Sequence, residues 1–104
     1  MQSIKSDLPQ GTLDLLILKV VTLGPVHGYA IAQRIHLLSR DGFLYPTLQK
    51  MLAKGWVEAK WGVSETNRKV RFYRLTPKGK VQLEQELASY GRITHAIQEV
   101  LRTA

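Results

Sequence analysis

The sequence predicts one domain that is mostly α-helical, with a small β-hairpin and a long helix at its C-terminal end. Apolar residues recur at helical spacing in three segments before residue 55. They alternate with polar residues, as strands require, between residues 56 and 75, and return to helical spacing from residue 77 to residue 102. A chain of 104 residues is the usual size of a single domain, so we expect one compact unit.

The first helix is expected from Leu13 to Leu23. Apolar side chains cover nearly all of its faces, which predicts burial on most sides. Thr12 is predicted to cap its start, and Asp14 places a negative charge in the first turn, where the helix dipole favours it. Gly24-Pro25 should end the helix, because glycine suits a left-handed cap and proline cannot continue a helix.

Two further helices are expected, at residues 28–39 and 43–54. The segment Arg40-Asp41-Gly42 joins them as a short turn. The apolar spacing predicts that the third helix buries Leu44, Leu48, Met51 and Leu52. Two helices joined by a three- or four-residue turn with glycine form the helix-turn-helix pattern.

A β-hairpin follows, with strands at residues 56–61 and 69–75 and a polar turn between them. A hairpin directly after a helix-turn-helix is a wing, so residues 1–76 are predicted to form a winged helix-turn-helix domain. Trp56 and Trp61 are interpreted as packing residues of the strands, with a base-stacking platform as the alternative.

The last helix is expected from Pro77 to Arg102, with Thr76 as its cap. An apolar stripe runs along it and has no partner in so small a monomer, so residues 77–104 are predicted to form a dimerisation helix. The residues assigned to the dimer contact are Leu83, Leu87, Tyr90, Ile93, Ile97, Val100 and Leu101. Gly91, inside this helix, predicts either a kink or a close contact with another helix.

The net charge of +7 is concentrated in one basic segment, residues 50–80. That segment holds nine Lys and Arg residues against two Glu, whereas the rest of the chain is close to neutral. Clustered cations are what a polyphosphate selects, because their binding releases counterions. The charge pattern therefore indicates double-stranded DNA as the partner.

The polar groups of the third helix and the cations of the wing are the candidate DNA contacts. Glutamine can pair with adenine, whereas lysine acts as a point charge suited to phosphate. Strand alternation puts Arg71 and Tyr73 on one face of the second strand and Arg74 on the other. For each candidate DNA contact, the alternative is an ordinary solvated side chain with no role in binding. The predicted DNA-binding residues are Tyr29, Tyr45, Thr47, Gln49, Lys50, Lys54, Arg68, Lys69 and Arg71.

Catalysis, metal binding and membrane insertion are not expected. The carboxylates are scattered, no glycine-rich phosphate loop is present, and the three histidines lack the spacing of a metal site, so we predict no catalytic residue, no metal and no cofactor. His27 is interpreted as helping the second helix to begin. The longest apolar run, Leu15–Leu18, is far below the roughly 20 residues of a membrane span. With no cysteine either, a cytoplasmic protein is expected.

Four segments of the chain together resemble the PadR-like transcriptional regulators. They are Gly11-Thr-Leu-Asp-Leu-Leu-Ile-Leu18, Gly24-Pro-Val-His-Gly-Tyr29, Leu44-Tyr-Pro-Thr-Leu48 and Tyr73-Arg-Leu-Thr76. The resemblance implies a dimeric winged helix-turn-helix repressor of the short type with a single C-terminal helix. It also implies that the recognition helix begins near Leu44-Tyr45-Pro46.

The function predicted is therefore a homodimeric, sequence-specific repressor of a palindromic operator. A small aromatic effector is a further hypothesis, based on the family and on Tyr90, Ile93 and Ile97. Two alternatives are kept. One is a non-specific architectural DNA-binding protein, and the other is a winged-helix module that binds proteins.

Overall fold

The structure is a computed structural model that describes residues 11–35 and 44–103. The helices are α1 (Thr12–Val21), α2 (Gly28–Ile35), α3 (Leu44–Lys54) and α4 (Pro77–Arg102), and the strands are β1 (Val26–His27), β2 (Val57–Val63) and β3 (Lys69–Leu75). The prediction of a mostly helical winged fold with a long final helix is confirmed. The predicted end of the second helix near Ser39 and the turn at residues 40–42 lie outside the described residues.

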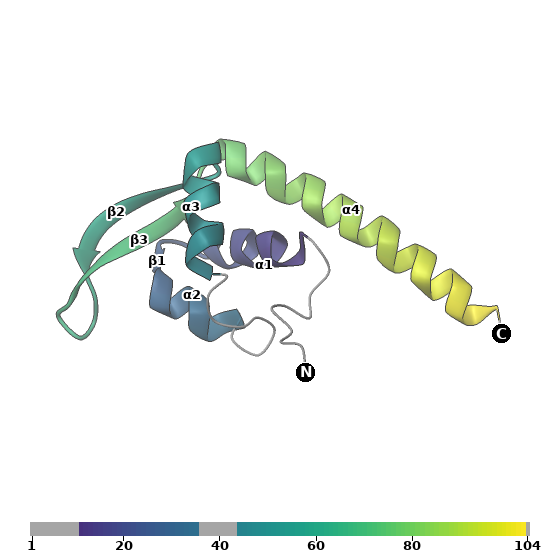
Figure 1. Ribbon diagram of the computed structural model, residues 1–104, viewed down its shortest axis with the longest axis horizontal. Helices are drawn as coiled ribbons and strands as arrows, with labels where there is room; N and C mark the ends of the chain where they lie inside the picture. The colour runs from purple at the N-terminus through teal and green to yellow at the C-terminus, as the bar shows by residue number, and fades with distance from the viewer. Residues whose placement is uncertain (1–10, 36–43, 104) are drawn as a thin grey trace.

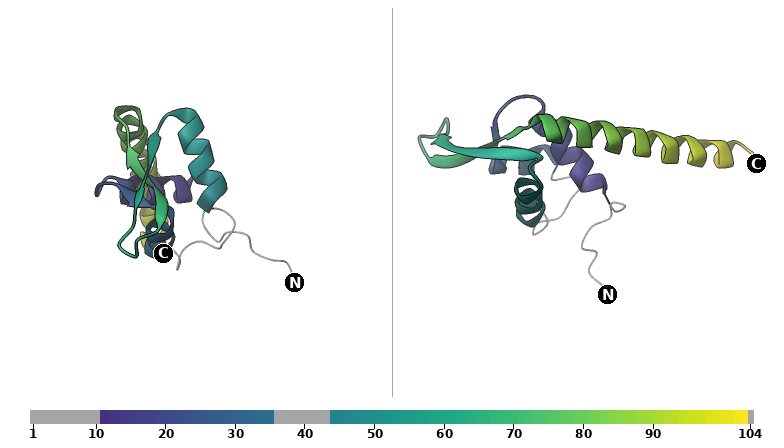
Figure 2. Two further views of the ribbon diagram at one scale, coloured as in Figure 1. Left: turned by 90° about the vertical axis from the view of Figure 1, so that its left-hand side faces the viewer. Right: turned by 90° about the horizontal axis from the view of Figure 1, so that it is seen from above.

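The molecule is elongated, with extents of 55 × 38 × 23 Å. Helix α1 lies in the middle, with α2 and α3 beside it, and the β2–β3 hairpin extends to one end (Figure 1). Helix α4 starts next to the hairpin, crosses α1 and continues beyond the rest of the chain toward the opposite end (Figure 2). The hairpin and the free end of α4 are therefore far apart.

A single hydrophobic core joins the helices to the base of the sheet. Helix α1 contributes most to it, with Leu15, Ile17, Leu18 and Val21 buried, as its nearly continuous apolar sequence predicts. The other buried members are Ile31, Ile35, Leu44, Leu48, Met51, Val57, Tyr73 and Leu83. Since the buried members of the sheet are Val57 and Tyr73, near its base, the rest of the hairpin extends beyond the core.

The sheet has three antiparallel strands in the order β1-β3-β2. The hairpin strands were predicted, although β2 runs two residues further than expected, to Val63. Strand β1 was not predicted. It consists of Val26 and His27 alone, paired with Tyr73 and Phe72 of β3, and two residues are too few to show an alternating pattern.

The ends of α1 differ from the prediction. Thr12 is the first helical residue and does not cap the helix. The N-cap is Gly11, whose φ of 89° lies in the left-handed region, so the helix start has no side-chain cap. At the other end the helix finishes at Val21, before the expected Leu23, and the Thr22 side chain donates to the Lys19 carbonyl at 2.6 Å.

The junction between the wing and α4 is tightly packed. The Thr76 hydroxyl accepts a hydrogen bond from the backbone N–H of Gly79 at 2.9 Å, which confirms Thr76 as the N-cap of α4. The same hydroxyl donates to the Gly55 carbonyl at 2.6 Å, at the end of α3. Gly79 lies against the Trp56 backbone so closely that a Cβ atom there would be 2.0 Å from the Trp56 carbonyl oxygen. The end of α3 and the start of α4 are thereby locked together.

One prediction about α4 needs correction. Leu83, assigned to the dimer contact, is only 6% exposed and belongs to the core of its own chain. At Gly91, for which a kink or a close helix contact was predicted, α4 continues unbroken, and outside the helix's own backbone no described atom of this chain lies within 4 Å of the position of a Cβ. In the described residues no helix, α4 included, is both long and apolar enough to cross a membrane.

Candidate nucleic-acid interface

Helix α3 presents one apolar and one polar side. Leu44, Leu48 and Met51, spaced by four and three residues, face the core. The predicted contact residues Tyr45, Gln49, Lys50 and Lys54 are exposed on the outer side, whereas Thr47 is half-buried at its edge. The outer side of α3 therefore offers a phenol, an amide and two cations for contact with a groove.

The first turn of α3 packs against the start of α2. A Cβ atom at Gly28 would lie 3.0 Å from Cε1 and 3.1 Å from the hydroxyl of Tyr45, so a glycine at this position leaves room for the tyrosine ring. The neighbouring Tyr29 is 66% exposed, and its hydroxyl accepts a hydrogen bond from the Gln33 side chain at 3.4 Å. An exposed tyrosine thus lies at the start of each of the two helices, α2 and α3.

His27 fixes the start of α2, as predicted. Its Nδ1 atom accepts a hydrogen bond from the backbone N–H of Ala30 at 3.2 Å. The imidazole also stacks on Tyr29, with ring centroids 6.4 Å apart, and meets the edge of Phe72 in β3 at 5.7 Å. The start of α2 is therefore tied to the wing.

No group of three or more potential metal ligands occurs in the part of the chain that the structure describes.

The two lysines of α3 have intramolecular partners. The Lys50 ammonium lies 2.6 Å from a carboxylate oxygen of Asp14 in α1. The Lys54 ammonium lies 5.5 Å from the centre of the Trp56 ring. These contacts orient both side chains, and for Lys50 the ion pair is a role that sequence analysis did not predict, because the partner is distant in the chain.

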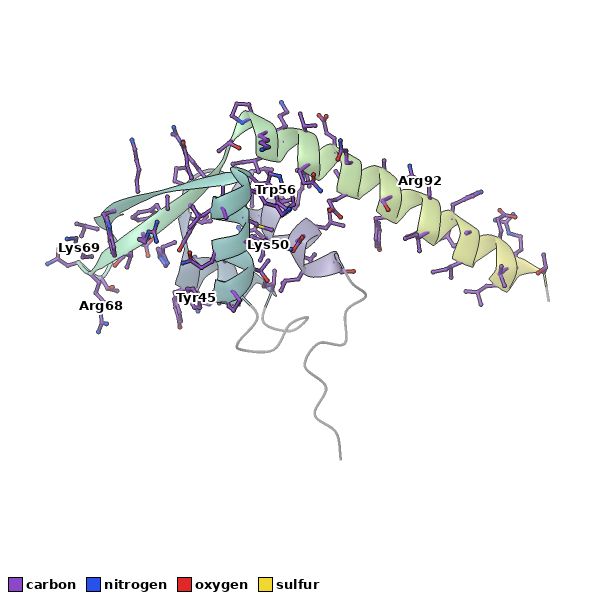
Figure 3. All side chains as sticks on the ribbon, turned by 45° about the horizontal axis from the view of Figure 1, so that its top comes forward. Tyr45, Lys50, Trp56, Arg68, Lys69 and Arg92 are labelled. Carbon is purple, nitrogen blue, oxygen red and sulfur yellow. The ribbon has the colours of Figure 1, made fainter. Side chains whose placement is uncertain are left out.

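The tip of the wing is a short turn with fixed geometry. The Ser64 N–H donates to the Arg68 carbonyl at 2.8 Å, and the Arg68 N–H donates to the Ser64 hydroxyl at 3.2 Å. Asn67 adopts a φ of 64°, a left-handed conformation that asparagine tolerates well. Arg68 and Lys69 extend from this tip, and Tyr45 lies at the start of α3 (Figure 3).

The cations of the hairpin are divided between its two faces. Arg71 and Lys69 lie opposite Trp61 and Val63 on the face that continues into the core through Tyr73, as the alternation predicted. Arg74 lies on the other face and forms an ion pair with Glu58 at 2.5 Å. We call Arg68, Lys69 and Arg71 the wing cations. Within the described residues none of the three forms an ion pair, so their charges are available to a polyanion.

The interpretation of the tryptophans is half correct. Trp56 is partly buried and packs against the core. Trp61 is 64% exposed and is not a core residue, because the hairpin has left the body of the protein where Trp61 occurs. Lys69 and Arg71 lie close to its ring. Alternation alone indicates the face of a strand but does not indicate where that face becomes exposed.

A second surface runs along α4 beyond Leu83. Here large apolar side chains that would normally be buried are 46–75% exposed. We call this set the exposed stripe, and its members are Leu87, Tyr90, Ile93, Ile97, Val100 and Leu101. Its position on a helix that extends past the rest of the chain separates it from the surface of α3 and the wing (Figure 1).

Known proteins share both the sequence pattern and this architecture. The pattern of the transcriptional regulator PadR-like family matches residues 17–85. The chain belongs to the PadR-like family of transcriptional regulators. The crystal structure of a PadR-like transcriptional regulator from Bacillus cereus strain ATCC 14579 superposes with a TM-score of 0.81 at 25% identity, covering 91% of this chain and 96% of the other.

Two further proteins match over similar lengths. A protein of Streptococcus mutans UA159 has a TM-score of 0.84 at 25% identity, covering 93% of this chain and 94% of its own. An uncharacterised protein of Lysinibacillus sphaericus is 28% identical over 100 residues, which cover 90% of this chain and 92% of that protein. This PadR-like chain is thus a DNA-binding transcriptional regulator, and α3 and the wing are the surfaces to consider for DNA.

Proposed function

We propose that this PadR-like protein is a homodimeric repressor that recognises a palindromic operator. The recognition helix α3 would enter the major groove with Tyr45 and Gln49, and the wing cations would contact the neighbouring backbone. The observation that carries the proposal is the exposed polar side of α3 together with Arg68, Lys69 and Arg71 of the wing, which have no acidic partner among the described residues. Tyr29, at the start of α2, would contribute a further contact.

Dimerisation would be mediated by the exposed stripe of α4. Two copies of the stripe can bury each other, and a two-fold axis would then place two recognition helices on one side of the DNA. Half-sites about 34 Å apart, one turn of the duplex, would follow from that symmetry. A repressor acts by occupying such a site and blocking transcription.

The experiment that tests sequence recognition is selection of bound sites from randomised DNA, followed by titration of the recovered duplex in the presence of unrelated competitor DNA. We expect a palindromic site and an affinity for it at least 1,000-fold higher than for unrelated duplex, the lower end of the range for specific regulators, which is roughly 10³ to 10⁷. Equal affinity for all duplexes would favour a non-specific architectural protein.

The contribution of the wing is tested by the double substitution Arg68→Ala/Lys69→Ala. It should weaken binding and reduce the slope of log K against log salt concentration by about 1.8, because each phosphate contact contributes about 0.9. The matched control is Arg92→Ala/Arg102→Ala, which removes the same charge from α4. No change in affinity or slope for the wing variant would instead support a winged-helix module that binds proteins.

A small aromatic effector completes the proposal. Tyr90, Ile93 and Ile97 are exposed on α4, and a pocket of about 520 Å³ lies between the end of α1, the end of β3 and the start of α4. Leu87 belongs both to the rim of this pocket and to the exposed stripe, so a ligand bound here could alter the dimer. The test is a thermal-shift screen with aromatic compounds, followed by release of labelled DNA. A screen in which no compound shifts the melting temperature would count against an effector.

A further inference from the structure

Trp61 is the most exposed aromatic ring of the hairpin, and two of the wing cations lie beside it. We propose that Trp61 is a positioning residue that holds Lys69 and Arg71 in place for contact with DNA phosphates. The inference rests on the proposed function, because it assigns to Trp61 a role in the contact between the wing and DNA.

The geometry of the hairpin brings these three side chains together. Trp61 pairs directly with Arg71 across the two strands, and Lys69 is two residues from Arg71 on the same face. The Lys69 ammonium lies 5.3 Å and the Arg71 guanidinium carbon 5.8 Å from the centre of the Trp61 ring. Both distances are within the roughly 6 Å over which a cation is attracted to an aromatic face.

A buried residue anchors this group. The Arg71 guanidinium also lies 5.8 Å from the ring of Tyr73, which is only 5% exposed and belongs to the core. Arg71 therefore lies near one ring that is buried in the core, Tyr73, and one exposed ring on the neighbouring strand, Trp61. A continuous set of contacts runs from the core through Tyr73, Arg71 and Trp61 to Lys69 near the tip.

This arrangement has a consequence for binding. Lysine and arginine side chains have many rotamers, and a phosphate contact normally restricts them at an entropic cost. Cations already held against an aromatic ring lose less freedom when they bind. Trp61 contributes little to the hydrophobic core, because its side chain is 64% exposed. Packing in the core therefore does not explain a tryptophan at this position.

The alternative is that Trp61 itself contacts the DNA, and a double-mutant cycle distinguishes the two roles. Equilibrium titrations would use the full-length protein and a labelled duplex carrying the selected site, with a random-sequence duplex of the same length for comparison. The variants are Trp61→Ala, Trp61→Phe, Lys69→Ala/Arg71→Ala, and the triple variant that combines this pair with Trp61→Ala. Circular dichroism and melting temperature would establish that each variant is folded.

We expect Trp61→Ala to weaken binding about fivefold, equivalent to about 1 kcal/mol, which is on the order of the entropic cost of immobilising one or two long side chains on binding. Trp61→Phe should recover most of the affinity, because it retains an aromatic face. In the background that lacks Lys69 and Arg71, Trp61→Ala should have no further effect. The loss of the Trp61 effect in this background is a readout that a purely structural role would not produce.

Two results would overturn the inference. Trp61→Ala could leave the affinity unchanged while Lys69→Ala/Arg71→Ala reduces it, or its effect could persist undiminished in the triple variant. Failure of the proposed function looks different, because selection would then recover no preferred site, as for a non-specific DNA-binding protein, or removal of the wing cations would not alter binding, as for a module that binds proteins.

Discussion

The Lys50 ammonium of α3 lies 2.6 Å from the Asp14 carboxylate of α1, so the proposed recognition helix is joined by an ion pair to the first turn of the central helix. Asp14 is 13% exposed in its side chain and Lys50 is 45% exposed. The carboxylate therefore has two favourable partners, the Lys50 charge and the positive end of the α1 dipole. Lys50 thus connects α3 to α1, the helix that contributes most to the core.

We predict that Asp14→Asn and Lys50→Met each lower the free energy of unfolding by about 0.5 to 1 kcal/mol, the upper part of the range for exposed ion pairs. Urea denaturation would measure the free energy of unfolding of each variant. The double variant should lose less than the sum, since the second substitution removes a partner that is already unpaired. Strictly additive losses would show that the two side chains do not interact, and high salt should reduce the coupling.

A second prediction concerns the close contact between Gly79 of α4 and the Trp56 carbonyl. A methyl group at residue 79 would lie 2.0 Å from that oxygen and 2.8 Å from Cδ1 of Leu75, and the backbone atom cannot move aside easily. Gly79→Ala should therefore destabilise the protein by about 3 kcal/mol, the upper part of the usual range for overpacking.

Gly91→Ala is the matched control for that substitution, because Gly91 lies in the same helix with open space around it. Removing a glycine from a helix interior should stabilise the protein by about 1 kcal/mol. Thermal unfolding of both variants gives the comparison. If the two substitutions shifted the melting temperature in the same direction, the packing assigned to Gly79 would be wrong.

A third prediction concerns the hydroxyl of Thr76, which accepts from the Gly79 N–H and donates to the Gly55 carbonyl. Thr76→Ala should cost about 1 to 2 kcal/mol, because a capping interaction and a link to the end of α3 are both lost. Thr76→Ser retains the hydroxyl and should recover most of this stability. Equal losses for alanine and serine would assign the effect to the methyl group instead.

Much of the fold follows from local sequence signals. The helical spacing of α3, the alternation of β3 and the Thr76-Pro77 helix start each involve residues close together in the chain, and the structure contains all three features. Strand β1 has no such signal, because its two residues become a strand only by pairing with Tyr73 and Phe72.

The candidate site is only partly predictable for the same reason. The exposure of Tyr45 and Gln49 follows from the period of α3, but the ion pair of Lys50 depends on a residue 36 positions away. Periodicity also places Leu83 and Leu87 on one stripe without indicating where that stripe leaves the core, which happens between these two residues. Tertiary contacts decide both the partner of Lys50 and the residue at which the stripe of α4 becomes exposed. Periodicity along the chain carries no information about these contacts.

The last prediction distinguishes the buried part of that stripe from its exposed part. Ile93 and Ile97 are 58% and 53% exposed, so Ile93→Lys/Ile97→Lys should leave the monomer fold intact while placing two charges in the proposed interface. The wild-type protein should have twice the 11.8 kDa mass of one chain in light scattering, and the double variant should have the mass of one chain. Its affinity for a palindromic site should fall, because two half-sites would no longer be bound together.

Two further variants serve as controls. Arg92→Ala changes a side chain about 100° around the helix from Ile93 and should leave the dimer unchanged. Leu83→Ala should instead destabilise the chain itself by about 2 to 5 kcal/mol, since a buried leucine side chain is removed from the core. A lysine double variant that remains a dimer of full DNA affinity would exclude the exposed stripe as the interface and require another explanation for its exposed apolar side chains.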